Sequence, residues 1–313
     1  MRAMAIAGFG GPERLERMSL SRPKPARGEV LVRAVAVGVN PVDWKIREGA
    51  LRGVLPHSFP IILGWDVAGI VDELGEGTSR LRKGDKVFAC ARKAVVQWGT
   101  WAEFVAVAET SAAILPPRLL FEEAASVPLA ALTAHQALAR ASVRPGDTVL
   151  VHAAAGGVGH FAVQLARGIG ARVYGTAGTT NQEFVLGLGA AGAIDYTRED
   201  FREALRRFCP EGVDVVLDCV GGETLARSFD ALRPLGRLVS IVDPNVAALA
   251  PAGIRAEFFF VEPSGEQLEG IAGLFSRQKL TTHVSKIYPL REAAQALALS
   301  QAGHVRGKLV MAL

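Results

Sequence analysis

A glycine-rich turn at residues 153–159 is the stretch of this sequence best suited to chemistry. It reads Ala154-x-Gly156-x-x-Gly159, follows a β-branched run at 148–151 and opens onto residues with helical apolar spacing. At such a turn Gly156 allows close approach of a pyrophosphate, and Gly159 allows the helix and strand to pack closely. The sequence therefore predicts a dinucleotide site. Its predicted phosphate-binding residues are Ala154, Gly156, Gly157 and Val158.

The segment after the next predicted strand, residues 175–181, bears on the choice of dinucleotide. An acid there would bind the ribose 2′-hydroxyl and repel a 2′-phosphate, and this segment contains none. Hydroxyl and amide groups there can donate hydrogen bonds to phosphate, so NADP is predicted over NAD. The same residues would form a polar turn equally well without a phosphate. The predicted cofactor-binding residues here are Thr176, Gly178, Thr179, Thr180 and Tyr196, with Asn181 as a further donor.

The elements that must position this turn follow from the residue pattern. Beyond residue 147, strand-like and helical stretches alternate, which predicts right-handed crossovers and a parallel, doubly wound α/β sheet of the Rossmann kind. Residues 122–140 are Ala-rich and predict a helix, whereas residues 257–262 predict a further strand.

Before residue 118 the pattern changes to short alternating strands separated by turns, which predicts a β-barrel-like domain. The strand-like tail that ends the chain can complete this domain, which would then be discontinuous. The predicted division is 1–118 with 263–313 for the first domain and 119–262 for the nucleotide-binding domain.

Composition excludes several classes of protein. The net charge is only +4 and the arginines are scattered, so nucleic-acid binding gains little support. The three cysteines form no CxxC pair, which argues against a disulfide framework or a cysteine-rich zinc lobe. No stretch resembles a secretory signal or a membrane span. We expect a soluble cytoplasmic protein that acts without a membrane.

Five motifs together resemble one known family along the whole chain. They are 153–159, Asn-Pro-Val-Asp at 40–43, Leu-Gly-Trp-Asp-Val-Ala-Gly at 63–69, Gly-Thr-Trp-Ala-Glu-Phe at 99–104 and Gly-His-Val-Arg-Gly-Lys at 303–308. The chain thereby resembles the zinc-independent quinone oxidoreductases (zeta-crystallin-like) of the medium-chain dehydrogenase/reductase superfamily. The resemblance implies a GroES-like barrel as the split domain, NADPH as cofactor, and a homodimer formed through the last Rossmann strand.

The resemblance also implies roles for residues of this chain. Asn40 would lie near the nicotinamide and the substrate carbonyl as the catalytic residue, although an Asn in a turn before Pro41 needs no such role. Lys308 would lie close to the cleft, with a solvated charge at a strand start as the alternative. The residues implied near the nicotinamide and its ribose are Thr133, Cys219, Val220, Ile241 and Val242.

The zinc alcohol dehydrogenases of the same superfamily are the competing interpretation. Zinc requires Cys, His or carboxylate ligands in tetrahedral array. By the resemblance, Asn40 replaces a ligand cysteine, and Gly64-Trp65-Asp66 replaces Gly-His-Glu. We therefore expect no metal site, and hydride delivery to a quinone or conjugated carbonyl in place of alcohol oxidation.

Protonation of the product is less clearly assigned. Many relatives carry a tyrosine two residues after the glycine that matches Gly49, and this chain has Leu51. Four histidines (His57, His135, His152 and His160) are chemically able to donate a proton, but lone histidines are more often structural. Asp43 with Lys45 could be a simple surface pair, and the tryptophans could line an apolar pocket or belong to the core.

The function predicted is reduction of quinones or α,β-unsaturated carbonyl compounds by NADPH. One alternative is an enoyl-thioester or alkenal double-bond reductase, which Leu51 weakens if a proton must reach carbon. Another is a non-catalytic NADPH-binding redox sensor.

Overall fold

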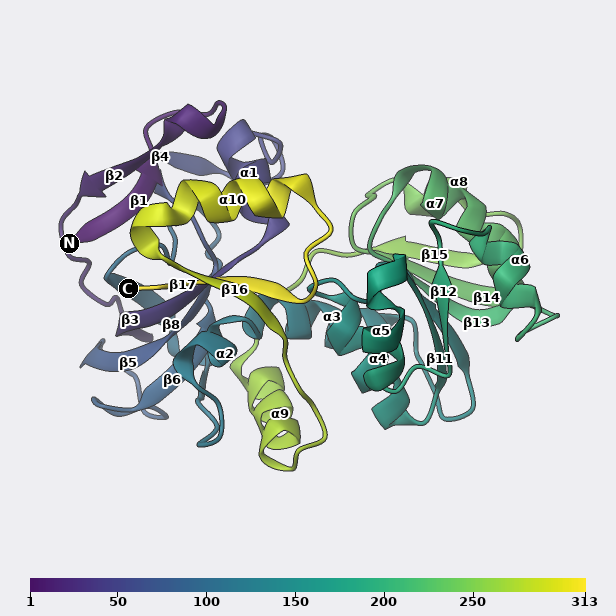
Figure 1. Cartoon of the computed structure of the whole chain (residues 1–313). Coiled ribbons are helices and arrows are strands. Elements are labelled where there is room, and N and C mark those ends of the chain that lie inside the picture. The colour runs from purple at the N-terminus through teal and green to yellow at the C-terminus, as the bar shows by residue number, and fades with distance from the viewer. The chain divides into compact units, whose positions relative to one another are not determined.

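The computed structural model describes residues 1–313, which form two compact units (Figure 1). Unit 1 comprises Met1–Leu132 and Pro263–Leu313, and unit 2 comprises Thr133–Glu262. The predicted boundary at 118/119 was too early, because helix α2 (Phe121–Ala125) packs on strands β3 and β5 of unit 1. None of the helices is long and apolar enough to cross a membrane.

Unit 1 contains two β-sheets. The smaller has the order β2-β1-β4-β7, and the larger has the order β16-β17-β3-β5-β6-β9, with β8 also paired to β3. Their strands are β1 (Arg2–Ile6), β2 (Leu15–Ser19), β3 (Glu29–Val39), β4 (His57–Ile62), β5 (Asp66–Leu74), β6 (Lys86–Cys90), β7 (Val96–Trp98), β8 (Phe104–Ala108), β9 (Ala112–Ile114), β16 (Val284–Pro289) and β17 (Lys308–Ala312).

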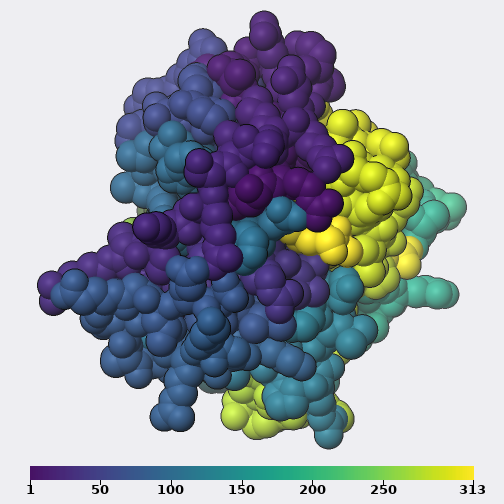
Figure 2. Space-filling model, turned by 90° about the vertical axis from the view of Figure 1, so that its left-hand side faces the viewer, coloured from purple at the N-terminus to yellow at the C-terminus, as the bar shows by residue number.

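Helices cover these sheets and link distant parts of the chain. They are α1 (Pro41–Glu48), α2, the start of α3 (Pro128–Arg140), α9 (Gly265–Ser276) and α10 (Ala293–Ala302). The C-terminal strand β17 pairs antiparallel with β3, which confirms that the tail completes the first unit. Figure 2 shows the N-terminal strands beside this C-terminal segment on one face.

Unit 2 is built on one parallel sheet with the order β12-β11-β10-β13-β14-β15, which confirms the doubly wound fold. Its strands are β10 (Thr148–Val151), β11 (Arg172–Ala177), β12 (Gly192–Asp195), β13 (Val213–Asp218), β14 (Leu232–Ser240) and β15 (Arg255–Phe258). Its helices are the rest of α3, α4 (Gly159–Ile169), α5 (Gln182–Gly187), α6 (Phe201–Arg206), α7 (Gly222–Ser228) and α8 (Val246–Leu249).

Two local predictions needed correction. The predicted helix at 122–140 is divided into α2 and α3, because Pro128 at the start of α3 has no N–H to continue the preceding helix. The strand predicted at 257–262 lies earlier, at Arg255–Phe258, where it pairs with β14. The chain also contains five short 3₁₀ helices, at Pro12–Arg14, Glu109–Ser111, Thr179–Asn181, Phe229–Ala231 and Leu290–Glu292.

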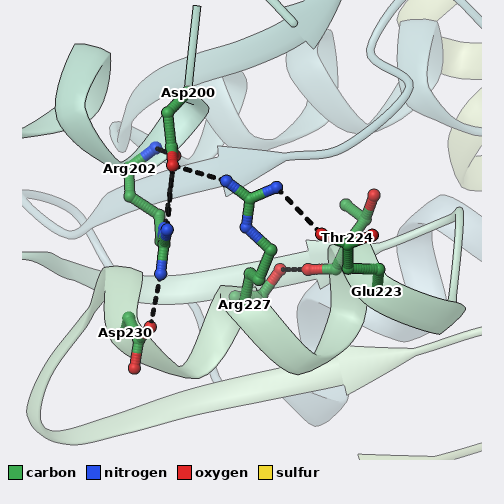
Figure 3. Close-up of polar contacts among 7 residues, drawn as sticks. Asp200, Arg202, Glu223, Thr224, Arg227 and Asp230 are labelled. Atoms are coloured by element: carbon green, nitrogen blue, oxygen red, sulfur yellow. Dashed lines mark hydrogen bonds and ion pairs between the residues drawn. The ribbon is translucent and has the colours of Figure 1, made fainter.

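An ion network ties the segment after β12 to helix α7 (Figure 3). Asp200 caps α6 by accepting from the Arg202 backbone N–H at 2.8 Å, and its carboxylate pairs with the guanidinium groups of Arg202 and Arg227. Arg202 also reaches Asp230 at 2.8 Å, and Arg227 reaches Glu223 at 3.3 Å. Because these groups are partly exposed, we expect the network to order this region locally and to add little to the free energy of unfolding.

The turn between β10 and α4 depends on close packing at one glycine. A Cβ atom on Gly159 would lie 2.2 Å from the Ala153 carbonyl oxygen and 2.7 Å from the Ala154 Cα. These are backbone atoms, which cannot move aside as a flexible side chain can. The third glycine of the motif is therefore required by packing, as the sequence predicted.

Replacing Gly159 with alanine should lower the free energy of unfolding by about 1–3 kcal/mol, the usual cost of overpacking. Gly168→Ala in the same helix is the matched control, because a Cβ there meets nothing within 4 Å. That control should stabilise the helix by up to about 1 kcal/mol. Urea unfolding of the two variants measures both effects, and equal midpoints would contradict the close approach at Gly159.

Candidate active site

Three neighbouring strands of unit 1 bring polar residues together at one end. Asn40 follows β3, Lys308 begins β17 and Asp66 begins β5, and β3 lies between the other two strands in the sheet. The register pairs Val39 with Leu309 and Val37 with Val67, so the three residues meet at the same edge. With Asp43 of α1 they form what we call the Asn40 cluster.

Hydrogen bonds fix the carboxamide of Asn40 at both ends. Its Nδ2 donates to Asp66 Oδ2 at 2.8 Å, and its Oδ1 accepts from the Lys308 ammonium. Lys308 Nζ also donates to the Val39 carbonyl at 2.9 Å and lies 3.7 Å from Asp66 Oδ2. The second N–H of the amide has no partner in this arrangement, so one donor remains for another group.

The position of Asn40 at the start of α1 does not explain its side chain. A residue there often caps the helix with its own side chain, but the Asn40 carboxamide makes no such bond. Asp43 instead accepts from the Asn40 backbone N–H at 2.7 Å, which orders the turn before Pro41. The Asn40 side chain is thus directed to Lys308 and Asp66, and the turn interpretation alone is insufficient.

The Asn40 cluster is buried, and its charges do not balance. Asn40 is 2% exposed, Lys308 4%, and both aspartates 0%. Two carboxylates face one ammonium. Burial raises the pKa of Asp43 to about 7, although hydrogen bonds from backbone N–H groups and the charge of Lys308 lower it. Burial also raises the pKa of Asp66 and lowers that of Lys308. The interpretations of Asp43 as a surface residue and of Lys308 as a solvated charge were therefore wrong.

The glycine turn of unit 2 has the features that a dinucleotide needs. It lies at the carboxyl end of β10, beside β13, where the strand order reverses. Helix α4 begins at Gly159. The His160 N–H donates to the Gly156 carbonyl at 3.1 Å, whereas the N–H groups of residues 157–159 donate to no backbone carbonyl and can bind an anion. Ala153 adopts φ +50°, a rare conformation for a non-glycine residue, which shapes the turn. These residues fit a bound pyrophosphate.

An aspartate that the sequence analysis did not single out organises the two loops predicted to lie along the ribose. Asp218, at the end of β13, accepts from the backbone N–H groups of Val220 at 3.0 Å and Gly221 at 2.9 Å, and from the Ser240 hydroxyl at 2.7 Å. Its carbonyl also accepts from Ile241 N at 3.1 Å. In the sequence, the feature that could have identified Asp218 is an acid that directly follows an apolar, strand-like run.

Another set of predicted residues gathers at the ends of β11 and β12. Thr179 follows Gly178 at the end of β11, and Tyr196, 48% exposed, follows β12. The Tyr196 hydroxyl lies 3.8 Å from where a Cβ on Gly178 would be. The structure therefore brings the three residues together, and their role toward a phosphate stays a prediction.

The histidines differ in surroundings. His152 is buried between the hydroxyls of Thr176, at 3.1 Å, and Ser228, at 2.9 Å, and burial lowers its pKa to about 4. A neutral, hydrogen-bonded histidine of this kind has a structural role. The Thr176 hydroxyl is therefore already hydrogen-bonded to a side chain of unit 2. The ring of His160 lies 2.9 Å from the Gly156 carbonyl.

The remaining predicted residues lie as follows. Thr133 is buried in α3, and Trp65 and Trp101 belong to the core, as one of the two interpretations of the tryptophans held. Trp98 is 39% exposed. No group of three or more His, Cys, Asp or Glu side chains is arranged to hold a metal ion.

Comparison with known proteins gives consistent matches. Residues 26–117 match the alcohol dehydrogenase GroES-like domain, and residues 188–311 match the zinc-binding dehydrogenase family model. A chloroplastic quinone-oxidoreductase homolog of Spinacia oleracea is 33% identical, with 99% of this chain and 98% of that protein covered. A chloroplastic NADPH-dependent alkenal/one oxidoreductase of Arabidopsis thaliana is 32% identical over 99% of this chain and 79% of that protein. The quinone oxidoreductase from Coxiella burnetii is 36% identical, with a TM-score of 0.92 and coverage of 100% and 99%.

The raised pKa of Asp43 predicts a pH dependence of stability. An acid whose pKa rises on folding stabilises the folded chain most below its unfolded pKa, 3.8, and this contribution is lost as the pH rises through about 7. Asp43→Asn cannot ionise. The variant should therefore gain stability relative to the wild type between pH 4 and pH 8, by on the order of a few kcal/mol.

Urea unfolding at several pH values measures this difference. Glu76→Gln is the control, because that carboxylate is exposed and pairs only with Arg27. Its difference from the wild type should stay flat over the same range. A flat difference for Asp43→Asn as well would contradict a proton held on Asp43 in the folded chain.

Proposed function

Since this chain belongs to the quinone oxidoreductase (zeta-crystallin-like) family of the medium-chain dehydrogenase/reductase superfamily, we propose that it reduces quinones or α,β-unsaturated carbonyl compounds with NADPH. The observation that carries the proposal is the Asn40 carboxamide, held at both ends by Lys308 and Asp66 with one N–H left to donate. Bound NADPH supplies a hydride from nicotinamide C4.

Asn40 is the residue we assign to the chemistry. As an acceptor gains a hydride, negative charge develops on its carbonyl oxygen, and a fixed N–H donor lowers the energy of that charge. Lys308 withdraws electron density from the Asn40 carbonyl oxygen, which makes the remaining N–H a stronger donor in this buried site. Asp66 holds the other N–H, so the amide cannot rotate away. Lys308 and Asp66 are positioning residues.

A quinone suits this chain better than an acceptor that must be protonated on carbon. Reduction of a quinone places the new proton on oxygen, where water can deliver it. By the resemblance to the family, Leu51 takes the place of a tyrosine that could donate a proton, and leucine has no proton to give.

The side chains of the Asn40 cluster argue for catalysis without zinc. Asn40 and Trp65 replace better zinc ligands, and Lys308 already neutralises Asp66.

Assembly and location complete the proposal. Strand β15 lies at the edge of the six-stranded sheet and pairs only with β14, so its outer edge is available to the same strand of a second copy. We therefore propose a homodimer through β15. The three cysteines are unpaired, which agrees with a reducing cytoplasm.

Turnover tests the proposal against the alternatives. NADPH oxidation should be measured with a panel of quinones, enones and an enoyl thioester, with and without a strong chelator. We expect turnover of quinones that is unchanged by the chelator. Binding of NADPH without oxidation by any acceptor would favour the redox sensor, and loss of turnover that zinc restores would contradict metal-free catalysis.

Asn40→Ala should lower the rate of single-turnover hydride transfer by about 10²–10³, the usual cost of one oxyanion donor. NADPH affinity should change little, because the phosphate contacts are assigned to unit 2. Asn40→Asp should be worse still, because it adds a carboxylate where negative charge develops.

The matched control is Asn245→Ala, since Asn245 also precedes a short helix without capping it by its side chain. That variant should transfer hydride at the wild-type rate. Melting curves run beside the kinetics separate a folding defect from a chemical one. Unchanged hydride transfer in well-folded Asn40→Ala would remove Asn40 from the mechanism.

A further inference from the structure

An acid stands beside the segment that was expected to read the 2′-phosphate, but it comes from the neighbouring strand. Asp195 is the last residue of β12, and the parallel register places it directly beside Ala177, the last residue of β11. The sequence rule inspects only the end of β11, which carries no acid. The pairing of β12 with β11 therefore places a carboxylate at the edge of the sheet where β11 itself has none.

Asp195 is held by the hydroxyls of its neighbours. Its Oδ2 accepts from Thr179 Oγ1 at 2.5 Å, and its Oδ1 accepts from Thr197 Oγ1 at 2.6 Å and from Thr197 N at 3.0 Å. The two hydroxyl oxygens lie 3.2 Å apart. The hydrogen bonds from Thr179 and Thr197 hold the pKa of Asp195 below its ordinary value, so this carboxylate is ionised at neutral pH.

These bonds change what the threonines can offer a ligand. A hydroxyl has one proton, and a threonine that gives it to Asp195 presents only lone pairs outward. Lone pairs and a carboxylate accept a hydrogen bond from a ribose 2′-hydroxyl. A 2′-phosphate has no donor for them at neutral pH beyond its weakly acidic proton, and its charge has the same sign as that of Asp195.

Two other groups at this edge favour binding of a 2′-phosphate. The Tyr196 hydroxyl, near Gly178, can donate to a phosphate, and Arg198 carries a positive charge. However, Arg198 Nε lies 3.5 Å from Asp195 Oδ2, and its side chain is 73% exposed, so its charge is partly compensated and well solvated. Gln182 donates its amide N–H to the Ala177 carbonyl at 2.7 Å and adds no charge.

We propose that Asp195 is a specificity residue that weakens binding of the 2′-phosphate of NADPH, so that this enzyme also binds and uses NADH. The inference rests on the proposed function, because it assumes that unit 2 binds a nicotinamide dinucleotide. The wild-type affinities for the two cofactors then differ by less than about tenfold, the equivalent of 1.4 kcal/mol.

Calorimetry with 2′,5′-ADP and 5′-AMP isolates the adenosine end of the cofactor from the reaction. Asp195→Asn should bind 2′,5′-ADP at least about tenfold more tightly than the wild type, because a like-charge contact is removed. Its affinity for 5′-AMP should stay the same or fall. NADPH and NADH, titrated into the same proteins, should follow the two fragments. Asp195→Ser is a second neutral variant, which keeps the test open if the first folds poorly.

Glu199→Gln is the matched control, since it removes a negative charge four residues away, where the carboxylate pairs with Arg207 at 2.6 Å. It should leave both fragment affinities unchanged. If folded Asp195→Asn and Asp195→Ser bind 5′-AMP but bind 2′,5′-ADP no more tightly than the wild type, the inference is overturned while the proposed function stands. A wild type that binds neither fragment nor either dinucleotide contradicts the nucleotide site itself.

Discussion

The burial of the Lys308 charge is the constraint on which unit 1 depends. An ammonium group that is 4% exposed must be paired and hydrogen-bonded, and its partners come from places far apart in the sequence. Val39 and Asn40 supply oxygens from the end of β3, and Asp66 supplies a carboxylate from the start of β5. The pairing of the C-terminal strand β17 with β3 brings Lys308 to these partners, so the site depends on the split of this unit along the chain.

Unit 2 uses carboxylates at strand ends for a related purpose. Asp218 gathers the N–H groups of the loop that follows its own strand and the Ser240 hydroxyl of the next strand. Asp195 does the same with Thr179 and Thr197 on the other side of the sheet. In both cases an acid orders the loops at the carboxyl edge, where a dinucleotide binds in folds of this kind. Asp218 is fully buried and can act on a ligand only through the loops that it orders. Asp195 is less buried, so its own charge can act on a ligand.

Local patterns account for what could be predicted from the sequence. The strand, glycine turn and helix around Gly159 involve contiguous residues, and alternation of strands and helices predicts the parallel sheet. The Asn40 cluster was only partly predictable, because Asp43 and Asp66 appear in the sequence as ordinary acids. Their burial depends on pairing between distant strands, β17 with β3 and β3 with β5. This pairing brings Lys308 to Asn40, which lies 268 positions earlier in the sequence. The place of Asp195 beside Ala177 could not be predicted for the same reason, since only the register of β12 with β11 brings the two residues together.

The charge of the Asn40 cluster also bears on the reaction proposed for it. With both aspartates ionised the cluster would carry one net negative charge, which would oppose the negative charge that develops on an acceptor oxygen. A proton on Asp43, whose pKa is about 7, leaves Lys308 and Asp66 as a neutral pair. The Asn40 N–H then faces the acceptor without like-charge repulsion, while the Lys308 ammonium still polarises its carbonyl. The burial that destabilises an ionised Asp43 therefore serves the same end as the hydrogen bonds that orient Asn40, because both make the cluster a better host for an oxyanion.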